Sequence, residues 1–366
     1  MIVKVKKEDL KEAVERAIKG VSARSTVPIL QSFLLEASDG FLSVLSTNLS
    51  IGIKTRIIAE TDEVGAICVE AKLLSEIVKK APGEEIFIEA DNFNNVNIRS
   101  LFTEFNIKGA DPGEYPTLPD IKKGNSITLK QEHFKQIIEK VAFSAAKEEL
   151  RPILTGILIE ISNGSITVVT SDGYRVTTAT SDLESDVKET KFIVPAKDLM
   201  GIIKILKEGD MTLEIHDKHV VLLFDTTEII LRRLEGEFIK YKDFLNLKGE
   251  EIRLKRSEIL NSLERMMLFS DEKINMVVIK ISKGEMILSS KSVKGSAREK
   301  IKVETEIEKA RIGINTKFLY EALKATESED LILRYTGEIQ PFYIIDKGYI
   351  NLTLPVKLVD EEEEAA

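Results

Sequence analysis

The sequence predicts an α+β fold in which a short strand, a helix and three antiparallel strands recur along the chain. In the stretch 151–180, strand-forming residues alternate on both sides of Asn163-Gly164 and Asp172-Gly173. An Asx-Gly pair between such runs is typical of a tight hairpin turn. The same stretch aligns without gaps with the N-terminal part of the chain, at a constant offset of 124 residues. The chain therefore repeats itself.

A helical apolar pattern follows a short alternating strand in each of three repeats, which begin near residues 2, 127 and 252. Apolar residues recur there at positions i, i+3, i+4 and i+7, which predicts amphipathic helices. These positions are Leu10, Ala13, Val14 and Ala17; Phe134, Ile137, Ile138 and Val141; and Ile259, Ser262, Leu263 and Met266. The strands that follow are expected to turn at Asp39-Gly40, Asn163-Gly164 and Lys283-Gly284.

The same motif begins again halfway through each repeat. The three further helices have apolar stripes at Leu74, Ile77 and Val78; at Leu199, Ile202 and Ile203; and at Leu319, Ala322 and Leu323. The unit is thus a βαβββ module used six times. Strands with one polar face need helices on one side only, so each pair of modules should form a domain with two helices packed on antiparallel sheet. The expected domains are 1–120, 121–247 and 248–366, the last with an acidic C-terminal extension.

Composition excludes several classes of protein. The 366 residues are 43% hydrophobic, enough for two or three domains with real cores. Cys68 is the only cysteine, so an intramolecular disulfide and a cysteine zinc site are impossible, and it is expected to pack as a small hydrophobic residue. The sequence has neither a membrane-spanning apolar run nor a signal-peptide pattern, which favours a cytoplasmic location.

Charge is distributed unevenly between the expected helices and the rest of the chain. The formal net charge of −9 argues against a uniformly basic surface, yet the six expected helical segments carry +5 between them. A closed ring of equal domains removes sheet edges and leaves a hole lined by one class of element. If helices line that hole, their mildly positive face would hold a polyanion through its phosphates, without reading bases.

Five motifs together resemble the family of bacterial DNA polymerase III beta subunits, the sliding clamps. They are Arg24-Ser-Thr-Val-Pro-Ile-Leu, Gly113-Glu-Tyr-Pro-Thr-Leu-Pro, Arg151-Pro-Ile-Leu-Thr-Gly, Thr170-Ser-Asp-Gly-Tyr-Arg and Leu354-Pro-Val-Lys-Leu. The likeness covers residues 1–358 in the family's order. It implies a head-to-tail homodimeric ring with helices around double-stranded DNA, no catalytic activity, no cofactor and no metal. The implied partners are the replicative polymerase alpha subunit, an ATP-driven clamp loader, and other polymerases and repair proteins that bind through short linear peptides; no membrane is involved.

The resemblance also implies three sets of site residues. The DNA-facing set is Arg24, Lys72, Lys197 and Lys317. The peptide groove consists of Leu154, Thr170, Gly173, Tyr174, Arg175, Val176, Phe244, Leu354, Pro355, Val356 and Leu358, with Arg175 and Lys357 expected to meet polar groups of the peptide. The dimer interface is Leu73, Ile77, Phe105 and Ile107 of one chain against Leu268 and Phe269 of the other.

The sequence departs from the family pattern at several of these places. Tyr174 replaces a more usual histidine, and Asp243 stands where a basic residue is common. Glu148 replaces a neutral polar residue in a loop on the DNA side, and the family's interface ion pairs are not clearly kept around Arg298 and Glu299. The acidic tail either discourages acidic peptides or is a solubilising end, and we favour the second interpretation.

Two other classes of function stay open at the level of sequence. An enzyme is disfavoured, because glycine-rich phosphate loops, HExxH helices and GxSxG elbows are absent from the sequence. His216 and His219 lie three residues apart in an expected hairpin loop, which gives no defined metal-ligand geometry. The alternative is a repeat scaffold that binds proteins without encircling DNA.

Overall fold

The structure, a computed structural model, describes residues 1–22, 26–119, 121, 124–148, 150–183, 189–245, 248–270 and 275–358. Within these residues the elements follow the predicted βαβββ order six times, with one additional strand, β5 (Glu60–Glu63). Short 3₁₀ helices lie in the connections: η1 (Ile18–Gly20), η2 (Pro28–Gln31), η3 (Pro112–Glu114), η4 (Pro152–Thr155) and η5 (Tyr241–Phe244).

Each module begins with one strand, continues through one helix and ends with three strands. The first pair is β1 (Ile2–Lys6), α1 (Lys7–Ala17), β2 (Ser32–Ser38), β3 (Phe41–Thr47), β4 (Ile51–Ile58) and β6 (Gly65–Glu70), α2 (Ala71–Lys80), β7 (Glu85–Ala90), β8 (Asn95–Ser100), β9 (Thr103–Lys108). The second pair is β10 (Asn125–Lys130), α3 (Gln131–Ala142), β11 (Gly156–Ser162), β12 (Ser165–Ser171), β13 (Arg175–Asp182) and β14 (Thr190–Pro195), α4 (Ala196–Ile202), β15 (Asp210–Ile215), β16 (His219–Phe224), β17 (Thr227–Arg232). The third pair is β18 (Glu250–Lys255), α5 (Arg256–Met267), β19 (Met276–Ser282), β20 (Glu285–Ser292), β21 (Gly295–Lys302) and β22 (Ala310–Asn315), α6 (Thr316–Lys324), β23 (Asp330–Tyr335), β24 (Phe342–Asp346), β25 (Tyr349–Thr353).

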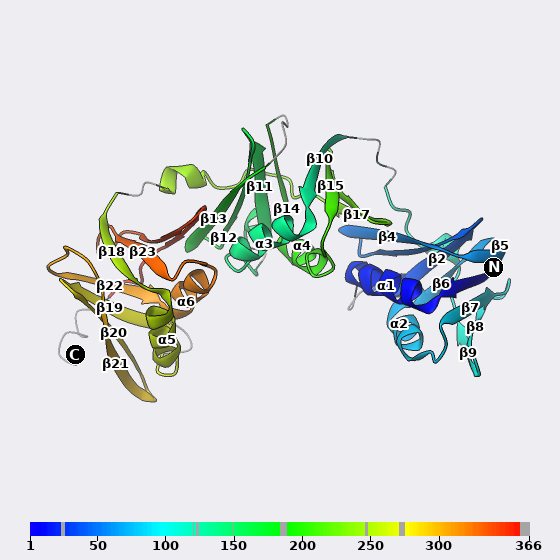
Figure 1. Ribbon diagram of the computed structural model, residues 1–366, viewed down its shortest axis with the longest axis horizontal. Coiled ribbons are helices and arrows are strands. Elements are labelled where there is room, and N and C mark those ends of the chain that lie inside the picture. The colour runs from blue at the N-terminus through cyan, green and yellow to red at the C-terminus, as the bar shows by residue number, and fades with distance from the viewer. Residues whose placement is uncertain are drawn as a thin grey trace. The chain divides into compact units, whose positions relative to one another are not determined.

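The chain divides into two compact units, each with two sheets (Figure 1). Unit 1, Met1–Lys135 with Lys197–Arg233, holds a five-stranded sheet, β5-β1-β7-β8-β9, and an eight-stranded sheet, β10-β15-β16-β17-β4-β3-β2-β6. Unit 2, Gln136–Ala196 with Leu234–Ala366, holds an eight-stranded sheet, β14-β11-β12-β13-β25-β24-β23-β18, and a four-stranded sheet, β21-β20-β19-β22. The boundary between the units passes through the predicted middle domain, so the three domain ranges stay a prediction.

Each eight-stranded sheet contains one junction between strands that the sequence assigns to different domains. In the first junction β4 pairs with β17, and Thr55 lies opposite Thr227. In the second junction β13 pairs with β25, and Ala179 lies opposite Tyr349. Both pairs are antiparallel. Since the offset of 124 residues relates Thr55 to Ala179, and both last strands begin at the paired residue, the two junctions have the same register.

The helices bury their predicted apolar stripes. In unit 1, α1 and α2 pack on each other and on the eight-stranded sheet, and in unit 2, α5 and α6 pack on each other and on strands of both sheets (Figure 1). Every apolar helix position expected from the sequence is buried. Leu10 and Leu74 belong to one hydrophobic core, and Leu263 and Leu323 to another. The amphipathic period therefore determined correctly which side of each helix faces the core.

Two helices end earlier than their sequence pattern indicates. Two of the six expected helical segments extend over residues 131–147 and 197–207, whereas α3 ends at Ala142 and α4 at Ile202. After each helix the backbone tightens into i→i−3 hydrogen bonds, such as that from the amide of Ser144 to the carbonyl of Val141. The hydroxyl of Thr170 also donates to the Val141 carbonyl at 2.5 Å, which satisfies a group at the helix end.

The hairpin turns follow the sequence prediction with one correction. Asn163 and Gly164 both have positive φ, +51° and +68°, as a two-residue turn between twisted strands requires. Tyr174, expected in a strand, lies in the turn before β13 instead. Cys68 is fully buried as expected, and burial raises the pKa of its thiol to about 12.

Candidate functional site

A cleft of about 710 Å³ in unit 2 brings together several sequence-predicted site residues. Leu154, Gly173, Tyr174 and Arg175 of the expected groove line it. Further lining residues come from 145–148, 150 and 151 and from helix α6. The structure thus brings together residues that are far apart in the sequence.

The turn between β12 and β13 is shaped by the carboxylate of Asp172. Its Oδ1 accepts the amide N–H groups of Tyr174 and Arg175, at 3.0 and 3.1 Å. The Ser171 hydroxyl accepts the amide of Gly173, which has a φ of +90° that suits glycine. These bonds present Tyr174 to solvent, with 66% of its surface exposed.

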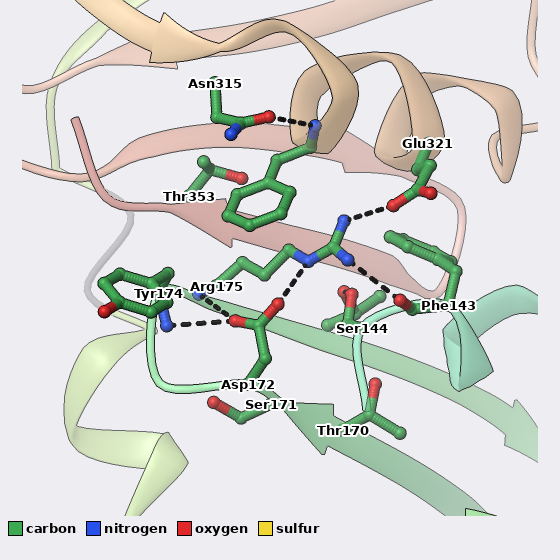
Figure 2. A network of polar contacts seen from close by, with 12 residues as sticks. Phe143, Ser144, Thr170, Ser171, Asp172, Tyr174, Arg175, Asn315, Glu321 and Thr353 are labelled. Carbon is green, nitrogen blue, oxygen red and sulfur yellow. Dashed lines mark hydrogen bonds and ion pairs between the residues drawn. The ribbon is translucent and has the colours of Figure 1, made fainter. Parts of the chain in front are cut away.

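The guanidinium of Arg175 is enclosed by acceptors from three segments: the turn before β13, helix α6 and the residue that follows α3 (Figure 2). Its Nε donates to Asp172 Oδ2 at 2.9 Å, its Nη1 to Glu321 Oε2 at 2.7 Å and its Nη2 to the Phe143 carbonyl at 2.9 Å. The cation also lies 4.1 Å from the centre of the Phe318 ring. Arg175 is 5% exposed, and these three hydrogen bonds already engage its guanidinium within the chain. Its contact with polar groups of a peptide stays a prediction.

Other expected groove residues are not among those that line this cleft. Thr170 is fully buried, and Val176 is buried in a hydrophobic cluster with Leu158 and Leu352. Phe244 is half exposed at the end of η5, and its carbonyl accepts the hydroxyl of Tyr343 at 2.9 Å. Burial raises the pKa of Tyr343, so this phenol stays a donor at neutral pH.

The C-terminal segment connects to the same turn and to β22. The amide of Leu354 donates to the carbonyl of Tyr174 at 2.9 Å, and Leu354 is 42% exposed. Pro355 follows it, half-buried. Val356 pairs with Gly313 through the backbone. A Cβ at Gly313 would lie only 2.7 Å from Leu358, so this glycine permits the close approach of the tail. The tail's role in a peptide groove stays a prediction.

The expected DNA-facing lysines share one place in their helices. Lys72, Lys197 and Lys317 are the second residues of α2, α4 and α6, and all three are exposed. Lys317 also lines the cleft beside Tyr174, which sequence register alone did not indicate. Arg24 lies outside the described residues. The contact of these side chains with DNA stays a prediction.

The expected interface residues lie near two sheet edges. β9, which carries Phe105 and Ile107, ends the five-stranded sheet, and β21 ends the four-stranded sheet. Leu73 and Leu268 are 40% and 67% exposed, and Phe269 packs near Gly295 at the start of β21. Ile77 is buried in the hydrophobic core, so its side chain has little surface to offer a second chain.

The described residues contain no cluster of three or more His, Cys, Asp or Glu side chains that could hold a metal ion. His216 lies in the expected loop between β15 and β16, where its amide donates to the carbonyl of His219. None of the helices in the described ranges is long and apolar enough to cross a membrane.

Comparisons with known proteins agree with the module repeat. Profiles of the DNA polymerase III beta subunit match the chain in three parts: the N-terminal domain at 1–119, the central domain at 128–240 and the C-terminal domain at 248–354. The beta sliding clamp of Halalkalibacterium halodurans is 30% identical, over 94% of this chain and 96% of its own. That of Bacillus subtilis is 29% identical, over 96% and 98%.

The fold agrees as well. The crystal structure of the DNA polymerase sliding clamp from Bacillus subtilis superposes with a TM-score of 0.94 at 28% identity, covering 98% of this chain and all of that one. A DNA polymerase III beta subunit from Thermotoga maritima gives 0.91 at 26% identity, with the same coverage. The repeat, the antiparallel sheets and these likenesses along nearly the whole chain place the protein in the DNA polymerase III beta subunit family, the beta sliding clamps.

Proposed function

We propose that this chain assembles head to tail with a second copy into a ring that encircles duplex DNA in the cytoplasm. The ring tethers the replicative DNA polymerase without sequence specificity for DNA. Short peptides of the polymerase alpha subunit, the clamp loader, and other polymerases and repair proteins dock in the cleft beside Tyr174. The chain acts by binding and catalyses no reaction.

The observation that carries this proposal is the repetition of one strand pairing. β4 pairs with β17 and β13 pairs with β25, in the same register. β4, β13 and β21 are the last strands of the first, third and fifth modules, and β9, β17 and β25 are the last strands of the second, fourth and sixth. By this order, the equivalent partner of β21 is β9. These two strands end their sheets. A second copy would pair β9 with β21 and close the ring, which leaves no such edge open to aggregation.

The repeated register supports a specific set of contacts between the two copies. The β3–β4 and β20–β21 hairpins are equivalent, and in their pairing Glu299 of β21 corresponds to Thr55 of β4. Thr103 is the first residue of β9, as Thr227 is of β17. By this correspondence Thr103 faces Glu299, and Glu104 faces Arg298. In the first junction Lys54 likewise faces Glu228. Opposite charges thus face each other in both cases, which favours this register.

Weak charge contacts suit a ring that must slide. Exposed lysines at the second position of α2, α4 and α6 would meet phosphates without reading bases. A closed ring needs no tight contact, because the DNA strand cannot leave it sideways. A polymerase held in the cleft by a flexible peptide rebinds its primer end at high effective concentration.

Retention on DNA of different topology tests the proposal. The protein is loaded by a clamp loader onto a nicked circular plasmid, half of the sample is cut once with a restriction enzyme, and release is followed by gel filtration. We expect the protein to stay on the circle and to leave the linear form. The same plasmid, loaded and left uncut, is the matched control.

Equal release from circular and linear DNA would contradict encirclement and would favour a scaffold that binds proteins only. Retention on both forms would indicate ordinary surface binding. In that case, release should increase steeply with salt on both forms alike.

A further inference from the structure

The candidate cleft contains a network of three charged side chains: Asp172, Arg175 and Glu321. Glu321 lies on α6, in a different module from the turn between β12 and β13 that carries Asp172. We infer that Glu321 of α6 is a positioning residue for peptide binding: through Arg175 and Asp172 it fixes the turn that presents Tyr174. This inference rests on the proposed peptide site and names a determinant of its affinity outside the predicted groove residues.

The chain of contacts is continuous from α6 to the turn (Figure 2). Glu321 Oε2 accepts Arg175 Nη1 at 2.7 Å. Arg175 Nε donates to one oxygen of Asp172, and the other oxygen of the same carboxylate accepts the amides of Tyr174 and Arg175. One carboxylate therefore holds the turn and the guanidinium at once, so a shift of the guanidinium is transmitted to the backbone of Tyr174.

Burial makes this geometry well defined. The side chains of Arg175, Asp172 and Glu321 are 6%, 15% and 26% exposed, so water competes weakly for their hydrogen bonds. The rings of Phe143 and Phe318 lie 5.2 and 4.1 Å from the guanidinium carbon and limit its movement. Glu321 supplies the acceptor for Nη1. Without it, that donor has to turn toward water or draw Arg175 away from Asp172.

Glu321 is a better test than Arg175 itself. Removing the guanidinium would leave the carboxylates of Asp172 and Glu321 close together without a cation, and such a variant can fail to fold. Glu321→Ala keeps both Asp172 and Arg175, so the guanidinium still has one carboxylate nearby, and Glu321→Gln keeps an oxygen that can accept Nη1. Glu308→Ala, which changes an exposed residue outside the network, is the matched control.

The experiment measures binding of a fluorescein-labelled peptide with two leucines, one phenylalanine and no charged side chains, by anisotropy on the full chain. We expect Glu321→Ala to weaken binding about tenfold, and Glu321→Gln less than about threefold. In a Tyr174→Ala background the loss caused by Glu321→Ala should disappear, because the turn no longer presents a side chain. A structural defect elsewhere would add to the loss instead.

Amide hydrogen exchange gives a readout that needs no peptide. Glu321→Ala should accelerate exchange at Tyr174 and Arg175 more than at amides outside the turn, such as those of β19. The comparison between amides is needed because the loss of one partner of a buried ion pair also lowers overall stability. Unchanged exchange, or additive losses in the Tyr174→Ala background, would overturn the inference. If the wild-type chain does not bind the peptide but Glu321→Ala still accelerates exchange at the turn, then the peptide site fails while the positioning contact stands.

Discussion

Arg16 shows at the scale of one residue how a buried charge connects a helix with a segment more than 200 residues further along the chain, at residues 225–227. It belongs to α1, and its Nη1 donates to the Thr227 hydroxyl at 2.8 Å. Its Nη2 donates to Glu12 and Asp225, both at 2.7 Å. The cation also lies over the ring of Phe224. Arg16 thus stabilises the first junction from the helix side.

We expect Arg16→Ala to lower the free energy of unfolding by about 3 kcal/mol, because it removes a buried guanidinium that donates to three partners. Chemical denaturation followed by circular dichroism measures the change. Lys11→Ala on the same helix is the control. It removes only an exposed pair with Glu8, and should cost less than about 1 kcal/mol. Equal effects of the two substitutions would contradict the role assigned to Arg16.

Glu12 makes the stability of the same cluster depend on pH. The hydrogen bond from Lys207 holds the pKa of Glu12 below its ordinary value of 4.5, against the opposing effect of burial, and the charge of Arg16 adds to the lowering. The folded state therefore binds this proton less readily than the unfolded chain. The resulting stability is present above pH 4.5 and is lost as the pH falls through the lower folded value.

Glu12→Gln should consequently flatten the decline of the melting temperature between about pH 5 and pH 3, because it removes one proton-linked contribution. Thermal unfolding at a series of pH values measures this slope. Glu15→Gln, at an exposed position of the same helix, is the matched control. A Glu12→Gln curve parallel to that of the wild type would show that this carboxylate does not contribute.

At the scale of elements, two glycines with positive φ differ in what surrounds them. Gly164 has a φ of +68° in the turn between β11 and β12, and the nearest neighbour of an added Cβ would be the Leu183 carbonyl at 3.7 Å. Gly348 has a φ of +62° in the turn between β24 and β25, and an added Cβ would lie 2.3 Å from the Thr180 carbonyl. The turn that contains Gly348 therefore packs closely against the backbone of β13. The amide of Thr180 donates to the carbonyl of Gly348 at the same place.

Alanine substitutions should separate the two effects. Gly164→Ala carries only the cost of an unfavourable backbone conformation, about 1 kcal/mol of unfolding free energy. Gly348→Ala adds a clash with backbone at the second junction and should cost about 2–4 kcal/mol. Denaturant unfolding of each variant beside the wild type measures both. The reverse order would mean that the junction can shift to accept a methyl group.

At the scale of the whole molecule, the proposed ring makes a prediction that depends on its head-to-tail symmetry. Glu104→Arg places like charges opposite Arg298 at both contacts of a homodimer, and Arg298→Glu places like charges opposite Glu104. Each variant alone should be mainly monomeric in sedimentation at low salt. A mixture of the two should form a dimer, because both of its contacts then join opposite charges.

The combined variant, Glu104→Arg with Arg298→Glu in one chain, should dimerise again by itself. Glu60→Arg reverses a charge on β5, at the opposite end of the same sheet from β9, and should leave the dimer intact. Dimers of Glu104→Arg as stable as those of the wild type would show that the two copies meet through other residues or in another register.

The sequence by itself determined the six modules and the buried side of each helix. These properties depend on local periods of two and 3.6 residues and on Asx-Gly pairs, which the chain carries within a few residues of one another. The apolar stripe of α5, for example, needed only the spacing of Ile259, Leu263 and Met266 to be placed correctly.

Only the tertiary structure decided which strands of different modules share a sheet and which groups surround Arg175. A strand edge offers the same backbone hydrogen bonds to any partner, so sequence pattern could not identify the pairing of β4 with β17. Glu321 lies 146 residues from Arg175, and a glutamate on an amphipathic helix looks like a solvated residue until the fold encloses it. The end of α3 could not be predicted for a related reason. The hydroxyl that donates to the Val141 carbonyl near this end belongs to Thr170 of β12, which is distant in the sequence.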